Sequence, residues 1–154
     1  MAHAEPKQEM VDLTREAEEL AAELARSEPQ RQATFTIAPG MSARGDNQLL
    51  RAVLANLLGN AWKYSAIRQE TMIEFGSTMR EGRRVFYVRD NGIGFDAEQT
   101  REIFVPFRRL PGAQRAGGFG IGLATVERII KRHGGEVWAE GEPGQGATFY
   151  FSLP

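Results

Sequence analysis

Three segments of the sequence repeat apolar residues at spacings of three and four, which limits the chain to folds that pack three amphipathic helices. The segments are residues 11–26, 47–64 and 121–133. Such spacing places the apolar side chains on one helix face, which must be buried against another layer. Asp46 or Asn47 is positioned to cap the second helix, and Gly134 with Gly135 should end the third.

Short runs of alternating apolar and polar residues flank the helical segments and indicate strands. These runs are residues 34–39, 72–76, 84–89, 136–140 and 147–153. Loops are expected at residues 40–45 and 108–119, and a short helical turn at 98–104. Turns at Glu81-Gly82 and Pro143-Gly144 should join two pairs of strands as hairpins. This order of elements predicts an α+β fold with helices on one face of a sheet.

The length and charge of the chain exclude several classes of protein. With 154 residues it holds about one domain, at the usual ~150 residues each. Its 19 Lys and Arg balance 20 Asp and Glu, so the charge gives no reason to expect nucleic acid or an anionic membrane as partner. No apolar run reaches the ~18–20 residues of a membrane span, and residues 1–7 do not form a signal peptide. A cytoplasmic location is therefore expected.

Cysteine and histidine usage limits the chemistry. The chain has no cysteine, which excludes disulfides, thiolate metal sites and cysteine nucleophiles. His3 and His133 are its two histidines, so imidazole metal chemistry is not expected. His3 lies near a terminus that should be frayed. His133 ends a helix just before Gly134, where a capping or surface role is expected.

The second helix carries a polar stripe apart from its apolar face. Asn56, Asn60 and Lys63 recur at i, i+4 and i+7, and small residues beside them would let a ligand approach closely. An amide carbonyl suits a hard metal ion, and lysine suits phosphate. Taken alone, the stripe favours an ordinary solvated helix face, because polar stripes on helices are common, and a ligand site is the alternative.

Two glycine-containing segments are further candidates for a ligand site. Asp90 comes at a strand end, followed by Gly92 and Gly94, which can take positive φ. Its carboxylate can accept a hydrogen bond from a ligand amino group, and a plain Asp-Asn-Gly turn is the alternative. Glycines at 118, 120 and 122 open the third helix, where unshielded amides favour phosphate, and a flexible surface loop is the alternative. Thr148 follows a hairpin turn and is a further candidate for a phosphate contact.

Taken in order, these segments resemble the catalytic ATP-binding domain of sensor histidine kinases. Its fold is shared with type II topoisomerases, one class of heat-shock chaperones and the MutL mismatch-repair proteins. The similar segments are residues 56–65 (asparagine box), 90–95 (first glycine box), 103–109 (phenylalanine box), 118–123 (second glycine box) and 146–154 (closing strand). The resemblance covers about residues 11–154, and residues 1–10 are expected to be a linker or a cloning remnant.

The resemblance implies a Bergerat-type ATP-binding fold. This is an α/β two-layer sandwich (α+β) with a mixed sheet of about five strands and three main helices on one face. The implied ligands are ATP and Mg²⁺. The implied ATP-binding residues are Asn56, Asn60, Lys63, Tyr64, Asp90, Gly92, Gly94, Phe107, Arg108, Arg109, Gly118, Gly120, Gly122, Leu123 and Thr148, with Asn60 also holding Mg²⁺.

The resemblance also implies individual roles. Asn60 would hold Mg²⁺ against the phosphates, and Lys63 with Tyr64 would contact phosphate and sugar. Asp90 would accept the adenine amino group, with Gly94 giving the ring room. Fixed donors of this kind match the charge that develops in phosphoryl transfer.

The implied lid follows the phenylalanine box. Arg108 or Arg109 would reach the γ-phosphate from this mobile lid, and Gly120 and Gly122 would offer amides to phosphate. Phe119 departs from the family, many of whose members have a small hydroxyl residue there.

Position 56 distinguishes activities within the wider fold. The ATP-hydrolysing relatives carry a Glu there as general base, whereas Asn56 cannot take up a proton. Slow hydrolysis and transfer of the γ-phosphate to another acceptor are therefore expected. The resemblance implies that this acceptor is a histidine, in two-component signalling. The alternatives are an ATP-binding-only module, an anti-sigma-type serine kinase and, less in keeping with Asn56, an ATPase clamp.

The resemblance implies partners as well. The phosphoacceptor His and its helical hairpin are expected to lie outside this chain, whose residues 6–10 would be the end of that hairpin. A response regulator would act downstream. The fragment is expected to be monomeric, with no nucleic acid and no direct membrane contact.

Overall fold

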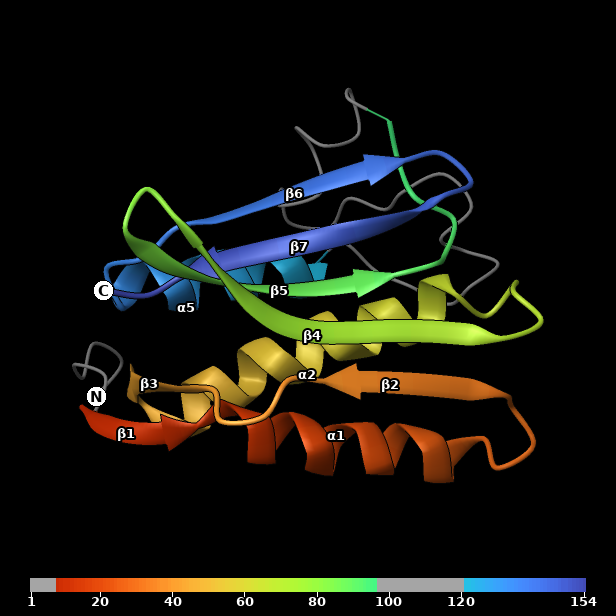
Figure 1. Cartoon of the computed structure of the whole chain (residues 1–154), viewed down its shortest axis with the longest axis horizontal. Helices are drawn as coiled ribbons and strands as arrows, with labels where there is room; N and C mark the ends of the chain where they lie inside the picture. Colours follow the sequence, from red (N-terminus) through yellow and green to blue (C-terminus); the bar gives the residue numbers. More distant parts are fainter. Residues whose placement is uncertain (1–7, 97–120) are drawn as a thin grey trace.

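The structure is a computed structural model that describes residues 8–96 and 121–154 of the chain. The elements in chain order are β1 (Glu9–Asp12), α1 (Leu13–Ser27), β2 (Ala33–Ile37), β3 (Ser42–Gly45), α2 (Asn47–Tyr64), β4 (Thr71–Arg80), β5 (Arg83–Asp90), α5 (Ile121–Arg132), β6 (Val137–Glu142) and β7 (Gly146–Ser152). Figure 1 shows one layer of long strands with the helices on one side of it.

Five strands form a mixed sheet in the order β2-β4-β5-β7-β6. The β2 and β4 strands are parallel, and the other neighbours are antiparallel. The helices α1, α2 and α5 lie on the same side of this sheet (Figure 1). The prediction of a mixed five-stranded sheet with three helices on one face is confirmed.

Local signals set the helix starts. Of the two predicted candidates, Asp46 and not Asn47 caps α2, because Asp46 Oδ1 accepts from the amides of Gln48 and Leu49 at 3.0 and 3.2 Å. The first helix begins at Leu13, two residues later than predicted, because Asp12 is its N-cap and accepts from the Arg15 amide. None of the three described helices combines the length and apolarity that a bilayer span needs.

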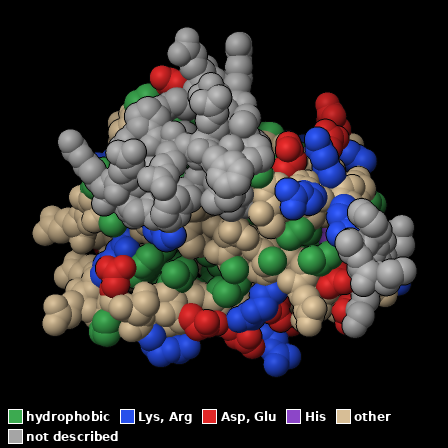
Figure 2. Space-filling view, turned by 180° about the vertical axis from the view of Figure 1, so that it is seen from behind, with side chains coloured by type: hydrophobic (Ala, Val, Ile, Leu, Met, Phe, Trp, Pro, Cys, Tyr) green, Lys and Arg blue, Asp and Glu red, His purple; other side chains and the backbone are tan. Residues whose placement is uncertain are grey.

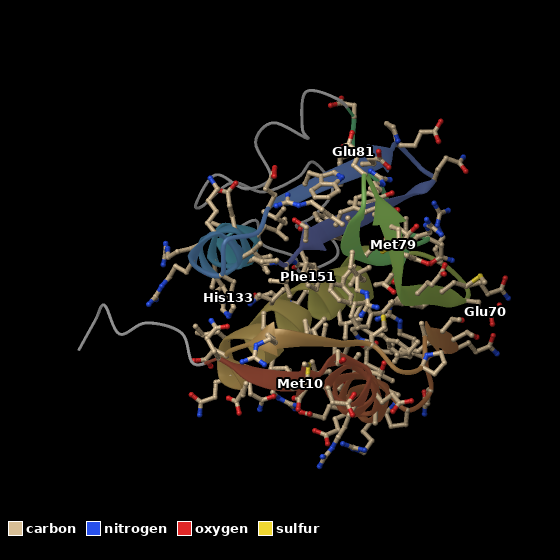
Figure 3. All side chains as sticks on the ribbon, turned by 60° about the vertical axis from the view of Figure 1, so that its left-hand side comes forward. Met10, Glu70, Met79, Glu81, His133 and Phe151 are labelled. Atoms are coloured by element: carbon tan, nitrogen blue, oxygen red, sulfur yellow. The ribbon has the colours of Figure 1, made fainter. Side chains whose placement is uncertain are left out.

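The core lies between the helices and the sheet. Fully buried phenylalanines on the inner face of the sheet pack against the leucines of α2: Phe75, Phe86, Phe149 and Phe151 against Leu50, Leu54, Leu57 and Leu58. Phe86 stacks on Phe151 with ring centroids 5.3 Å apart, and Figure 3 shows Phe151 between the two layers. The apolar face predicted for α2 is therefore the buried one.

Two N-terminal segments differ from the prediction. Residues 42–45, expected to be loop, form β3, which pairs antiparallel with β1 in a separate two-stranded sheet. Glu9 and Met10, expected to end a helical hairpin, lie in β1. Each strand has only four residues, and their partners lie about thirty residues apart. Such short, distant pairing leaves no local periodicity to detect.

His133 is buried rather than on the surface, with 9% of its area exposed. Its Nε2 accepts from the Asp46 amide at 3.1 Å, which leaves Nδ1 to donate to the Ile129 carbonyl at 2.8 Å. The predicted capping role agrees with the second bond, and the surface role is wrong. Figure 3 shows His133 at the end of α5, where it joins that helix to the start of α2.

Candidate functional site

The C-terminal half of α2 brings polar side chains into the interior. Asn60 and Tyr64 are buried, with 7% and 2% of their areas exposed, whereas Lys63 is exposed and Asn56 half-buried. The stripe is therefore not a simple solvated face. Within the described ranges, Asn60 Nδ2 and the Tyr64 hydroxyl are buried and have no hydrogen-bond partner. Buried polar groups without partners are uncommon and call for a ligand or water.

Asp90 supplies a buried carboxylate at the end of β5, with 4% of its area exposed. Its Oδ1 accepts from the Gly92 amide at 2.8 Å, whereas Oδ2 finds no partner among the described residues. Burial raises the pKa of Asp90 to about 7, and the amides of Gly92 and Ala147 act in the opposite direction. Burial, and then the charge of Asp90, raises the pKa of Tyr64 to about 12. The site thus holds one unused acceptor beside unused donors.

Gly92 lets the loop after β5 touch the end of α2. The Ile93 amide donates to the Tyr64 carbonyl at 3.2 Å. A Cβ on Gly92 would lie 2.5 Å from that carbonyl oxygen and 2.9 Å from Asp90 Oδ1. The expected positive φ is absent at Gly92, so the close approach of α2 is what requires glycine there.

Gly94 has the expected positive φ, 68°. A Cβ on Gly94 would also collide with the carbonyl oxygens of Glu142 and Gly146. The loop is thereby packed against the turn between β6 and β7, where the Gly144 amide donates to the Ile93 carbonyl at 2.7 Å.

Two further residues hold this loop and were not singled out from the sequence. Arg68, between α2 and β4, donates to the carbonyls of Asn91, Gly92 and Gly144 at 2.7, 3.1 and 2.5 Å. The Asn91 amide group donates to the Glu70 carbonyl at 2.9 Å, and its Oδ1 accepts from the Met72 amide at 3.0 Å. The Asp-Asn-Gly turn sequence could have identified Asn91 as a residue of this loop. No sequence pattern identifies a single arginine in the connection between a helix and a strand.

Thr148 does not lie beside the Asp90 side chain. Asp90 pairs with Ala147 in the β5–β7 register, and Arg89 pairs with Thr148. Paired residues share a face and successive residues alternate, so Thr148 points to the sheet face opposite the helices. There its hydroxyl accepts from Arg89 at 3.4 Å. The phosphate contact predicted for Thr148 has no support from this register, and Ala147 is the residue opposite Asp90.

Several predicted residues fall outside the described ranges. They are Phe107, Arg108, Arg109, Gly118 and Gly120, together with the 98–104 helical turn, the 108–119 loop and Phe119. Gly122 lies in the first turn of α5. Leu123 follows it and is fully buried in the core, so its side chain packs against the other helices and the sheet.

The surface charges on the helix side are mixed. Figure 2 shows acidic and basic side chains together along its lower edge, where α1 lies. There Arg51 of α2 pairs with Glu16, Glu19 and Glu23 of α1 at 2.6, 3.1 and 3.0 Å. Within the described part of the chain, no three His, Cys, Asp or Glu residues group as a metal site. A cation here would need oxygens from a ligand as well as an amide such as Asn60.

Solved structures that superimpose on this chain include histidine kinases. A mycobacterial sensor histidine kinase, MprB, superimposes with a TM-score of 0.79 at 23% identity, over 95% of this chain and 97% of that one. Full-length ShkA, solved in complex with AMPPNP, superimposes with a TM-score of 0.78 at 28% identity, over 98% of this chain and 32% of that one.

The sequence also matches curated relatives and a family model. The methanogenesis regulatory histidine kinase FilI of Methanothrix harundinacea is 42% identical over 112 residues, which are 72% of this chain and 12% of FilI. The chain therefore spans only a small part of this relative. Residues 45–154 match the model of the histidine kinase-, DNA gyrase B- and HSP90-like ATPases. With this match, the shared fold and the polar site between α2 and β5, the chain belongs to the histidine kinase-, DNA gyrase B- and HSP90-like ATPase family.

Proposed function

We propose that this domain binds ATP with Mg²⁺ and transfers the γ-phosphate to a histidine of a separate helical hairpin domain in two-component signalling. The observation that carries the proposal is the trio of unpartnered buried atoms: Asn60 Nδ2, Tyr64 Oη and Asp90 Oδ2. All three belong to the two boxes that contact each other at the end of α2. A ligand rich in donors and acceptors would satisfy them.

The adenine amino group is the partner proposed for Asp90 Oδ2. An ionised carboxylate only accepts hydrogen bonds, and an amino group only donates in this setting. Gly92 and Gly94 let the loop pack against the end of α2 and the β6–β7 turn, which fixes the position of Asp90 for this contact. ShkA, which shares this fold, was solved in complex with AMPPNP, and this supports a nucleotide as the ligand.

The polyphosphate would lie along α2. Lys63 is exposed and carries a positive charge suited to phosphate, and the start of α5 at Gly122 would offer amides. Asn60 would hold Mg²⁺ through its side-chain amide oxygen, and the ion, when bound, would neutralise phosphate charge. Phe107, Arg108, Arg109, Gly118 and Gly120 are proposed to close over the phosphates.

Asn56 favours transfer over hydrolysis. Its Nδ2 donates to the Ala52 carbonyl at 2.8 Å, and its amide cannot act as a base. Water would therefore lack a general base at this position. The acceptor imidazole nitrogen would bond to the γ-phosphorus as the bond to the ADP oxygen breaks, with the imidazole proton passing to solvent. The histidine kinase named among the relatives supports this acceptor.

The test combines the domain, labelled Mg-ATP and a hairpin domain that carries the acceptor histidine. Label should appear on the hairpin and not on a His→Gln hairpin, and Asp90→Asn in the catalytic domain should reduce it. Good nucleotide affinity without any label would favour an ATP-binding-only module. Label on a serine would favour the anti-sigma type, and release of phosphate alone would favour a clamp ATPase. A response regulator partner and a cytoplasmic location belong to the same proposal.

A further inference from the structure

The Arg68 side chain donates hydrogen bonds to two consecutive peptide units of the loop after β5. Its Nε donates to the Asn91 carbonyl at 2.7 Å, and its Nη2 donates to the Gly92 carbonyl at 3.1 Å. The carbonyl of Asn91 and the amide N–H of Gly92 belong to one peptide plane, and the carbonyl of Gly92 and the N–H of Ile93 belong to the next. Arg68 therefore holds the oxygen end of both planes.

The nitrogen ends of the same two planes contact the site. The Gly92 N–H donates to Asp90 Oδ1 at 2.8 Å, and the Ile93 N–H donates to the Tyr64 carbonyl at 3.2 Å. The peptide unit is planar and rigid, so a peptide whose carbonyl oxygen is bonded to Arg68 keeps its N–H directed at its own acceptor. A cationic donor on the carbonyl also polarises the amide and strengthens the bond that its N–H donates. Arg68 thus acts on Asp90 through one peptide and on the end of α2 through the other.

The position of Arg68 is itself held from two sides. Its Nη2 also donates to the Gly144 carbonyl at 2.5 Å, which ties it to the β6–β7 turn. Asn91 fastens the loop to the residues that flank Arg68 on its C-terminal side, Glu70 and Met72. The α2–β4 connection and the loop after β5 therefore form one unit around the guanidinium.

We propose that Arg68 is a positioning residue. It fixes the orientation of the Asp90 carboxylate, and so the direction of its free Oδ2, and this determines the selectivity of the site for adenine. Guanine carries a carbonyl oxygen where adenine carries its amino group, so a well-aimed carboxylate accepts from adenine and repels guanine. A carboxylate that can rotate discriminates less, because it can avoid the repulsion. The inference rests on the proposed ATP-binding function.

Three variants test the inference by titration with Mg-ATP and Mg-GTP. Arg68→Met keeps an apolar stem and removes the hydrogen-bond donors, Arg68→Lys keeps a charged donor, and Arg84→Met is the matched control. Arg84 lies at the opposite end of β5 and donates to the Ser42 carbonyl at 3.4 Å. Arg68→Met should weaken ATP binding by about tenfold, the change expected when one buried hydrogen bond is weakened. It should lower the preference for ATP over GTP, with Arg68→Lys intermediate and Arg84→Met unchanged.

A double-mutant cycle with Asp90→Asn separates positioning from general stabilisation. If Arg68 acts through Asp90, adding Arg68→Met to Asp90→Asn should cost little further ATP affinity. Full additivity, or an unchanged preference for ATP over GTP, would overturn the inference. Arg68→Lys supplies the same comparison if Arg68→Met does not fold. If Asp90→Asn alone leaves ATP binding unchanged, the proposed function itself fails, and that result is distinct from additivity.

Discussion

Replacing Asp90 by asparagine should stabilise the ligand-free protein above neutral pH and at the same time weaken ATP binding. Burial raises the pKa of this carboxyl from 3.8 to about 7. Each unit corresponds to ~1.4 kcal/mol, so holding the ionised carboxylate in the folded protein costs about 4 kcal/mol. Asparagine keeps an oxygen for the Gly92 amide and carries no charge to bury.

The pH dependence gives this prediction its sign. Below the unfolded pKa both states are protonated, and the stability is undiminished. As the pH rises from about 4 to about 7 the unfolded chain loses this proton and the folded chain keeps it, so the free energy of unfolding falls. Above about 7 both states are ionised and the loss is complete. Between about pH 5.5 and about pH 8.5, the advantage of Asp90→Asn over the wild type should grow by about 2 kcal/mol.

Urea unfolding of the ligand-free protein at those two pH values measures the difference. Glu18→Gln, which removes an exposed carboxylate on α1, is the control and should follow the wild type at both. ATP titration at the higher pH should show the opposite ranking, with Asp90→Asn binding ~1–3 kcal/mol more weakly because its amide cannot accept fully from adenine. An advantage that does not change with pH would refute the assignment of a buried carboxyl with a raised pKa at Asp90.

Other substitutions test neighbouring contacts. Gly92→Ala should lower both the melting temperature and the ATP affinity, because its Cβ would lie 2.5 Å from the Tyr64 carbonyl oxygen; unchanged unfolding would contradict the close approach. Asn60→Asp should weaken Mg-ATP binding by ~1–3 kcal/mol. Calorimetry with and without EDTA should show that the metal-dependent part of the affinity changes. Equal binding by the variant and the wild type would show that Asn60 is not part of the site. His133→Leu should cost ~1–3 kcal/mol of unfolding free energy, because the part-buried Asp46 amide loses its acceptor at 3.1 Å, while ATP affinity stays the same. A stability equal to the wild type would contradict that bond.

Local patterns in the sequence were enough to predict the three described helices, a cap at Asp46 or Asn47, the β4–β5 hairpin and the strand end at Asp90. These features depend on residues close together in the chain, where spacing, caps and turn chemistry act. The order of the asparagine, glycine and phenylalanine boxes was likewise enough to indicate the family, because the residue types and their spacing can be recognised in the sequence alone.

Tertiary structure decided the rest. The parallel pairing of β2 with β4 and the small β1–β3 sheet join segments that are distant in sequence. Register, not composition, turned Thr148 away from Asp90. Gly92 is required by the approach of α2, and Arg68 acts through peptide planes 23 and 24 residues away. Such contacts depend on which distant surfaces meet in the folded chain, and no local pattern encodes that meeting.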